Sequence, residues 1–397
     1  MTGPLRIAFV SMHTSPAELP GSGDAGGMNV VEYNQAFALA ELGHRVDLIT
    51  RRNEPGQPDV VELSPAVRLL HLPAGQPAKL AKSLIDAHVE EFSTGLSGLK
   101  PYDVVHSHHW MSGVAALPVA RVWDAPHIQS FHSVAALPGS SLSEGEPPES
   151  PARVPGERLV ATESDAVIAI SAAEARTVVE RCGADPAQVV IVPPGVDRTL
   201  FHAEPGDAPA LSDNPNGYLL YAARLQPLKG PDLAIGALAE VPAELRPELL
   251  IAGDVSADFA AYEAELHALV EAHGLSRSVQ FIGPQPRERL AALMRGARIV
   301  LVPSHSETFG LIALEAESCG TPVIASAAGG LREAVVHGET GQLMDSRQPQ
   351  DWGTAITRLL ARPQLLARMG VVAQIHARRF NWGWTARLLE FHYRGLL

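Results

Sequence analysis

The sequence predicts an α/β protein in which two domains, each built around a parallel sheet, face a central cleft. Its 397 residues are roughly two to three times the length of a typical single domain, so two separate cores are expected. Short apolar runs alternate with turns and with helical periodicity along the whole chain, and this alternation is typical of parallel sheets. We predict that residues 1–200 and 215–375 form the two domains.

The first domain is expected to begin with a buried strand and to continue as strand, helix, strand. Asn29–Leu42 places its apolar residues on one face of a helix that ends at Gly43. Gly139–Gly156 is rich in Ser, Pro and Glu and is predicted to be a mobile loop. The strands expected here are Leu5–Val10, Arg45–Thr50, Val67–Leu72, Val104–His106, Ile128–Phe131, Ala166–Ile170 and Val189–Val192.

The second domain is expected after Ala203–Gly217, a patch rich in Pro, Asp and Asn that we interpret as the hinge. Its predicted strands are Tyr218–Ala223, Leu249–Ala252, Val279–Ile282, Ile299–Pro303 and Val323–Ala325. The last residues, 380–397, carry aromatic and aliphatic side chains at helical spacing. We expect this C-terminal helix to pack back on the first domain.

Composition narrows the classes of protein that fit. A formal net charge of −13 argues against nucleic acid as the main partner. No apolar run is long enough to cross a bilayer, and the N-terminus lacks the features of a secretory signal. Cys182 and Cys319 lie far apart in sequence and predict no disulfide framework. A cytoplasmic protein is the expectation, with the oligomeric state left open, a homodimer included.

The segment His305–Gly320 is the most informative about function. It places Glu307 and Glu315 eight residues apart around a Phe-Gly turn, between a predicted strand and a predicted helix. Open α/β sheets bind ligands at such turns, because free N–H groups of the first helical turn attract anions. Its one cysteine and one histidine lack partners at zinc-ligand spacing, so no metal site is predicted. Backbone donors and carboxylates together suit a phosphorylated sugar.

A glycine-rich loop precedes the first helix. Gly21, Gly23 and Gly26 match the spacing G-x-G-x-x-G, and Gly27 follows. The match lies about a dozen residues past the first strand and has no suitably placed acidic partner, so a dinucleotide fold is not favoured. Glycines at a helix start still let the backbone approach a diphosphate. The alternative is a flexible surface loop.

Two further clusters follow predicted strands. In H-S-H-H-W, from His106 to Trp110, a zinc site is not expected, and His106 is interpreted as a hydrogen-bonded core residue. His132, at the tip of the next strand, is the better functional candidate. Arg224 and Lys229, five residues apart in R-L-Q-P-L-K-G, can both reach one diphosphate, the alternative being solvated surface charges.

Together these residues resemble the retaining glycosyltransferases of family 4, which have the GT-B architecture of two Rossmann-like domains. The resemblance covers essentially the whole chain. It depends on R-L-x-x-x-K-G at Arg224–Gly230, E-x7-E at Glu307–Glu315 and G-T-P-V-I-A at Gly320–Ala325. It implies transfer of a sugar from a nucleotide diphosphate with retention of anomeric configuration and with neither a metal nor another cofactor.

The resemblance also implies a donor site. Arg224 and Lys229 would hold the diphosphate and stabilise it as the leaving group, Glu315 would bind the ribose, and Glu307 would bind the sugar hydroxyls. With His132 beside the transferred sugar, Arg224, Lys229 and Glu307 are the catalytic candidates. The remaining donor-binding candidates are the amides of Phe309, Gly310 and Leu311, and the loop glycines Gly26 and Gly27.

The first domain is similar to that of the mycothiol-pathway enzymes that transfer N-acetylglucosamine from UDP to inositol 3-phosphate. S-M-H-T-S-P, G-D-A-G-G-M-N-V and H-S-H-x-W-x-S-G carry this likeness. By resemblance the acceptor-binding candidates are Asn29, Lys82, His109, Ser133 and Arg153.

The acceptor side also departs from those relatives. His109 stands where they have Tyr, Ser133 where they have Thr, and Ala136–Gly139 replaces A-x-V-K-N. Gln285 stands where a relative has an Arg near the base. A UDP-N-acetylglucosamine-like donor with an inositol phosphate-like acceptor is favoured. The alternative is a GDP- or other nucleotide sugar with an aminocyclitol or small-thiol acceptor.

Two other classes of protein fit part of these observations. A phosphorylase of the same architecture would use inorganic phosphate or pyridoxal phosphate, and no lysine has an obvious Schiff-base setting. A sugar-nucleotide sensor would keep the pocket without turnover, but both glutamates and both cations of the donor motifs are present.

Overall fold

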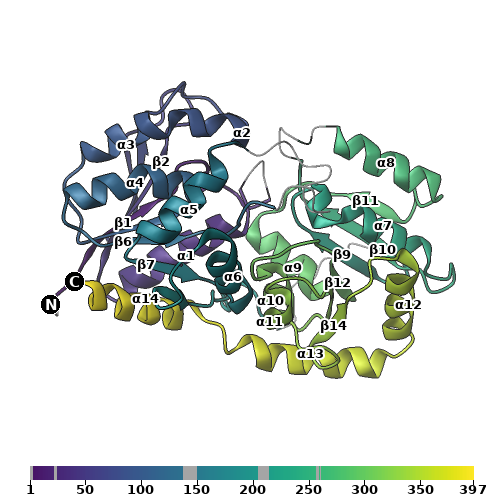
Figure 1. Cartoon of the computed structure of the whole chain (residues 1–397). Coiled ribbons are helices and arrows are strands. Elements are labelled where there is room, and N and C mark those ends of the chain that lie inside the picture. Colours follow the sequence, from purple (N-terminus) through teal and green to yellow (C-terminus); the bar gives the residue numbers. More distant parts are fainter. Residues whose placement is uncertain (1–2, 22–24, 137–149, 204–213, 256–258, 260) are drawn as a thin grey trace.

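The computed structural model describes residues 3–21, 25–136, 150–203, 214–255, 259 and 261–397. Two α/β units lie side by side, and the C-terminal helices run beneath both (Figure 1). The predicted fold class, two parallel-sheet domains facing a cleft, is confirmed. No described helix is both long and apolar enough to span a membrane.

The first sheet has the order β3-β4-β2-β1-β5-β6-β7-β8, with every pairing parallel except β3 with β4. Its strands are β1 (Arg6–Val10), β2 (Arg45–Arg51), β3 (Val60–Ser64), β4 (Val67–Leu72), β5 (Val104–His108), β6 (His127–Ser130), β7 (Ala166–Ala169) and β8 (Val189–Ile191). The α-helices are α1 (Gly27–Glu41), α2 (Lys82–Ile85), α3 (Val89–Ser97), α4 (Trp110–Val122), α5 (Arg153–Glu163) and α6 (Ala172–Thr177).

The second sheet has the order β11-β10-β9-β12-β13-β14 and is parallel throughout. Its strands are β9 (Tyr218–Ala222), β10 (Glu248–Ala252), β11 (Val279–Phe281), β12 (Ile299–Val302), β13 (Val323–Ser326) and β14 (Gly341–Met344). The α-helices are α7 (Pro231–Ala239), α8 (Tyr262–Ala272), α9 (Arg287–Gly296), α10 (Leu311–Ser318), α11 (Leu331–Ala334), α12 (Pro349–Leu360), α13 (Pro363–Ala377) and α14 (Trp382–Leu396).

Each sheet is buried on both faces, which explains why most strands are continuous apolar runs. Strand order reverses beside β1 in the first sheet and beside β9 in the second. The loops after β1 and β5 and those after β9 and β12 therefore leave the sheets at topological switch points, where open α/β sheets bind ligands. This topology brings four chemically informative segments to one cleft.

Helix α14 belongs to the core of the first domain (Figure 1). Leu389 and Tyr393 are fully buried, and the Tyr393 hydroxyl lies 2.6 Å from His106 Nδ1. The chain crosses between domains twice at one place, where the amide of Val196 donates to the carbonyl of Phe380 (3.3 Å). A Cβ atom on Gly195 would lie 2.3 Å from the Trp382 nitrogen, so the two crossings pack backbone against backbone.

Two local predictions need correction. The loop predicted over Gly139–Gly156 is wrong in its last four residues, because Arg153–Gly156 forms the first turn of α5. Pro155 is tolerated there, since N–H groups of the first turn have no helical partner. Helix α1 starts at Gly27, two residues before the predicted start at Asn29. The rest of the loop prediction (139–149), residues 204–213 of the predicted hinge, and Gly23 lie outside the described residues.

Candidate active site

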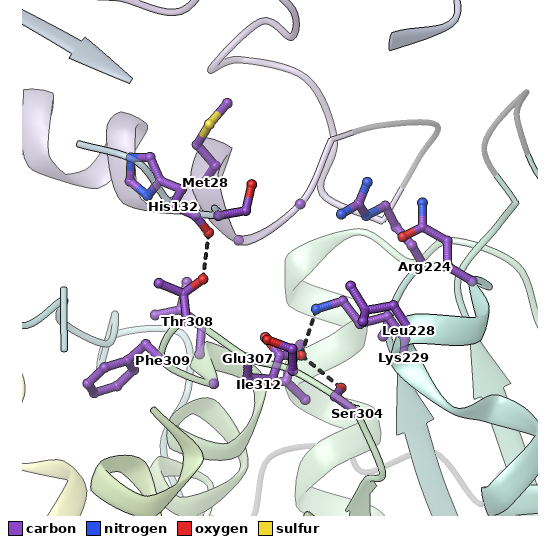
Figure 2. Close-up of a pocket in the computed structure, with 18 of the residues that line it drawn as sticks. Met28, His132, Arg224, Leu228, Lys229, Ser304, Glu307, Thr308, Phe309 and Ile312 are labelled. Carbon is purple, nitrogen blue, oxygen red and sulfur yellow. Dashed lines mark hydrogen bonds and ion pairs between the residues drawn. The ribbon is translucent and has the colours of Figure 1, made fainter. Parts of the chain in front are cut away.

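A cavity of about 590 Å³ lies between the domains and is lined by the loops at both switch points. The predicted donor and acceptor residues all line it. Figure 2 shows how both domains contribute, with Met28 and His132 from the first and Arg224, Lys229 and Glu307 from the second.

Lys229 and Glu307 are held together at the ends of neighbouring strands. Lys229 Nζ lies 2.7 Å from Glu307 Oε1, and the Ser304 hydroxyl donates to the same oxygen at 2.9 Å (Figure 2). The turn that carries Lys229 ends at Gly230, which has φ +68°, and a Cβ atom there would lie 2.3 Å from the Pro303 carbonyl oxygen. Close packing of this turn on the end of β12 therefore places the cation beside the carboxylate.

The loop that carries Glu307 is fixed by two glycines. The amide of Gly330 donates to the Glu307 carbonyl at 2.9 Å, and a Cβ atom on Gly329 would lie 2.1 Å from that same oxygen. Gly310, with φ +106°, then starts α10. The Phe309 side chain is buried in the core, so its backbone amide is the group that it can offer a ligand. Leu311 opens the helix, whose first amides form an anion-attracting end.

Glu315 lies one turn further along α10 and is 3% exposed. Burial raises the pKa of its carboxyl group, and the Arg287 guanidinium, 2.8 Å away, counters this effect. Arg287 also lies over the ring of Phe201, 4.8 Å from its centroid. The sequence motifs did not single out Arg287, although it lies two residues after Gln285, at the start of α9.

The glycine-rich loop of the first domain faces the donor residues across the cleft. A Cβ atom on Gly26 would lie 3.5 Å from Arg224 Nε, and one on Gly27 would lie 3.6 Å from a Leu311 methyl carbon. Asn29 shapes this loop, because its side chain accepts from the Gly26 amide (2.8 Å) and donates to the Ser15 carbonyl (2.7 Å). The absence of a side chain leaves room beside Arg224 at Gly26 and beside Leu311 at Gly27.

His132 has φ +58°, an unusual conformation for a residue with a Cβ atom, and partly lines the cleft. Its carbonyl accepts from the Thr308 hydroxyl of the second domain at 2.5 Å (Figure 2). Burial lowers the pKa of the imidazole to about 3, so the ring is neutral. Glu174 supports the same turn through a backbone hydrogen bond with His132, and burial raises its pKa to about 7. Neither Thr308 nor Glu174 was predicted.

The predicted acceptor residues line the part of the cavity that belongs to the first domain. Arg153 pairs with Glu157 at 2.8 Å and donates to the Ser133 hydroxyl at 3.3 Å. His109 has φ +71° and is buried, and neither ring nitrogen has a hydrogen-bond partner. Its ring lies 4.3 Å from that of His13, which the sequence motifs had not assigned a role. Of the divergent segment Ala136–Gly139, only Ala136 is described.

The cleft concentrates positive charge in a chain with a net charge of −13. Lys82 and Arg153 are among the cations on its first-domain wall, and Arg224 and Lys229 are among those on its second-domain wall. Two pairs of cations on opposite walls suit two phosphorylated groups in one cavity. The carboxylates of Glu307 and Glu315, on the same wall as Arg224 and Lys229, can accept hydrogen bonds from sugar hydroxyls. Fold and site together define a glycosyltransferase of the GT-B architecture.

The comparisons with known proteins agree with this class. The family model described as "Glycosyl transferases group 1" matches residues 207–375, and that described as "Glycosyl transferase 4-like domain" matches residues 26–195. A D-inositol 3-phosphate glycosyltransferase of Kineococcus radiotolerans is 40% identical, over 98% of this chain and 95% of its own. One of Stackebrandtia nassauensis is 40% identical, over 97% and 90%. The chain belongs to this family of group 1, family 4-like glycosyltransferases.

Solved structures show the same architecture. A sucrose-phosphate synthase from Thermosynechococcus elongatus superposes with a TM-score of 0.91 at 30% identity, covering 99% of both chains. Anabaena HepE, in complex with UDP and glucose, superposes with a TM-score of 0.78 at 21% identity, covering 98% of this chain and all of its own. With the family match, this architecture shows that the protein is a glycosyltransferase enzyme.

Proposed function

We propose that this enzyme transfers a sugar, with retention of anomeric configuration, from a UDP-N-acetylglucosamine-like donor to an inositol phosphate-like acceptor. One observation carries the proposal: a single cavity has cationic side chains on both walls, with the carboxylates of Glu307 and Glu315 beside the cations of the donor wall. A donor diphosphate and an acceptor phosphate would each meet one pair of cations. Relatives that are 40% identical carry the name D-inositol 3-phosphate glycosyltransferase.

The donor half follows from the contacts of the second domain. Glu315 in α10 would accept hydrogen bonds from the ribose hydroxyls, and the amides at the start of α10 would donate to the diphosphate. Glu307 would bind hydroxyls of the transferred sugar while Lys229, which pairs with it in the structure, would turn to phosphate oxygens. A carboxylate that already holds the cation keeps both groups in place before the donor arrives.

Retention follows if the acceptor hydroxyl attacks the face of the sugar from which the diphosphate leaves. The departing phosphate oxygen then takes the hydroxyl proton, and Arg224 and Lys229 offset the charge that develops on it. We propose that these two cations, together with the α10 amides, replace a metal ion in this step. Transfer measured in the presence of a chelator should therefore continue at the same rate.

The acceptor half depends on the first domain. Lys82 and Arg153 would hold the acceptor phosphate, with the Ser133 hydroxyl and the imidazoles of His109 and His13 around it. A phosphate offers acceptor oxygens to all of these donors. A second candidate function uses a GDP- or other nucleotide-sugar donor with an aminocyclitol or small-thiol acceptor. The departure of His109 and Ser133 from the residues of the relatives favours this candidate.

The test is a matrix of donors and acceptors. UDP-N-acetylglucosamine and GDP-sugars are each incubated with inositol 3-phosphate, with free inositol and with a small thiol, and nucleotide release is measured. We expect release of UDP that requires inositol 3-phosphate. Release of GDP, or equal rates with free inositol, would overturn the choice in favour of the second candidate.

A further inference from the structure

Three ionisable side chains meet behind the wall of the cleft, away from the donor contacts. They are Glu32 in α1, His108 at the end of β5 and His132 after β6. His108 Nδ1 lies 2.8 Å from His132 Nε2 and 3.8 Å from Glu32 Oε1. Glu32 and His108 are fully buried, whereas His132 lines the cavity. The cluster therefore runs from the interior of the domain to the place proposed for the transferred sugar.

The buried position of the Glu32 carboxyl group lowers the stability of the fold. Neither carboxyl oxygen has a hydrogen-bond partner of normal geometry, and the polar groups beside the carboxyl include His108 and the hydroxyl of Ser11. Burial raises the pKa of this carboxyl group well above its ordinary value. A buried polar group without a good partner costs about 1–3 kcal/mol of stability. A buried and poorly hydrogen-bonded carboxyl group beside a cleft indicates a role in function and not in stabilising the fold.

The distance between the two histidines favours a hydrogen bond between the rings over a metal ion bound by both. Two imidazole nitrogens that bind one tetrahedral zinc ion lie about 3.3 Å apart, given the usual bond lengths. The 2.8 Å between His108 and His132 is instead the length of a hydrogen bond. One of the two neutral rings therefore donates an N–H hydrogen bond to the other.

The surroundings decide which ring donates. His108 Nε2 is buried without a partner. If its proton sat on Nε2, the result would be a buried orphan N–H group, which is rarer than a buried acceptor without a donor. A proton on Nδ1 lies instead between Glu32 and His132 Nε2. His132 then accepts through Nε2 and carries its own proton on Nδ1, the nitrogen left to meet a ligand.

We propose that Glu32 and His108 are positioning residues that hold His132 in the Nδ1–H tautomer, so that His132 donates a hydrogen bond to an oxygen of the transferred sugar. This inference rests on the proposed function only in placing the sugar beside His132. The backbone of His132 is held separately, through its carbonyl, by Thr308. Figure 2 shows its ring turned away from Lys229 and Glu307, toward the first domain. Its partner His108 also stacks on His106, with ring centroids 4.4 Å apart.

Three variants test the chain of contacts. His108→Leu removes the donor, and kcat should fall about 10- to 100-fold while the donor KM changes less than about twofold. His108→Asn places an amide nitrogen where Nδ1 was and should recover most of that loss. Glu32→Gln should lower kcat about tenfold without lowering Tm, because it removes a poorly paired buried carboxyl group.

The matched control is His44→Leu. His44 is also buried and also lies beside a glutamate, 3.3 Å from Glu390, but it does not line the cavity. It accepts from the Leu5 amide at 3.1 Å, so its loss should lower Tm and leave kcat unchanged. Opposite effects of Glu32→Gln and His44→Leu on Tm and kcat would separate a positioning role from a structural one.

The tautomer itself can be observed by nitrogen-15 NMR of histidine side chains, with the His132 signals assigned by their loss in His132→Asn. We expect Nδ1–H in the parent and a shift toward Nε2–H in His108→Leu. An Nε2–H parent, or unchanged kcat in both Glu32→Gln and His108→Leu, would overturn the inference. So would a stoichiometric metal ion that is lost in His108→Leu. A parent that transfers no sugar would contradict the proposed function instead, and the tautomer would still be measured.

Discussion

At the scale of single residues, the two glutamates of the donor loop have separate surroundings and therefore separate tasks. Glu307 is partly exposed and paired with Lys229, whereas Glu315 is buried and paired with Arg287. A partly exposed carboxylate beside a cation can interact with a group whose charge changes during the reaction. A buried carboxylate that is held by an arginine is suited to bind a part of the ligand that does not react, such as the ribose.

We therefore expect Glu307→Gln to lower kcat about 100-fold or more, with the thermal shift produced by UDP unchanged, since it removes an interaction used during transfer. Glu315→Gln is the matched change, and it should mainly weaken the thermal shift produced by UDP. Enzyme turnover and thermal shift measured on both variants check the pair. Identical profiles for the two variants would contradict this division of tasks.

His109 predicts a pH dependence of acceptor use. Burial and then the charges of Lys82 and His13 hold the pKa of His109 well below its ordinary value, so the ring is neutral. A phosphate dianion against the ring raises that pKa, and the complex then binds protons that the free enzyme does not. The acceptor KM should consequently rise as pH increases through the pKa of His109 in the complex.

The variant His109→Tyr restores the residue of the relatives and removes the titrating group. The acceptor KM of this variant should lack the rise with pH that His109 causes in the parent. Titration of the acceptor phosphate affects both proteins alike, so it cancels when the parent KM is divided by the variant KM. A ratio that stays constant from pH 6 to pH 9, about the range that a perturbed histidine would cover, would mean that His109 does not meet the anion.

The sequence predicted the residues whose chemistry is tied to a local pattern. Lys229 and Glu307 could be placed together because each follows a buried parallel strand, and such strand ends share one edge of a sheet. Arg287, Thr308 and Glu174 were missed, since each acquires its role through a partner distant in sequence. His109 was noted for its type, but its contact with His13 depends on a backbone conformation that no local pattern indicates.

At the scale of elements, α14 is a C-terminal helix that completes the first domain. Tyr393 places its hydroxyl against the buried ring of His106. Tyr393→Phe removes this partner from a buried nitrogen and should lower the free energy of unfolding by about 1–3 kcal/mol in denaturant titrations.

Phe391, two residues earlier, provides the control, because it is 71% exposed. Phe391→Leu should change the free energy of unfolding by no more than about 0.5 kcal/mol. Equal effects of the two substitutions would show that α14 does not depend on its buried face.

Elements buried on both sides were predicted well, because parallel strands in such sheets are continuous apolar runs. The two strands that were missed, β3 and β14, lie at sheet edges and are largely not buried, so their apolar signal is short and mixed. The start of α5 was missed because Pro155 and Gly156 are typical of turns, and a proline in a first helical turn has the same local signature.

At the scale of the whole molecule, the domains meet through hydrogen bonds on the wall of the cleft. The Ser171 hydroxyl donates to the Thr308 carbonyl at 2.6 Å, and Glu333 accepts from the amides of Ala172 and Ala173 at 3.0 and 3.1 Å. These contacts join α6 of the first domain to α11 and the donor loop of the second. Few polar contacts across a cleft are easily broken, so domain closure should depend on them.

Glu333→Gln removes the charge that binds the start of α6 and should favour an open arrangement. We expect small-angle X-ray scattering to show a larger radius of gyration for the ligand-free variant than for the parent. Adding UDP should reduce the difference, since a donor bound to both domains favours closure. Equal radii without ligand would contradict a role for Glu333 in closure.

The central claim is that one cleft joins a nucleotide sugar to a phosphorylated polyol with retention of configuration. Proton NMR of the product formed from UDP-N-acetylglucosamine and inositol 3-phosphate tests it most directly, because the coupling constant of the anomeric proton reports the configuration. We predict an α-linked product formed in step with UDP release. A β-linked product, or UDP release without any glycosylated inositol phosphate, would contradict the account.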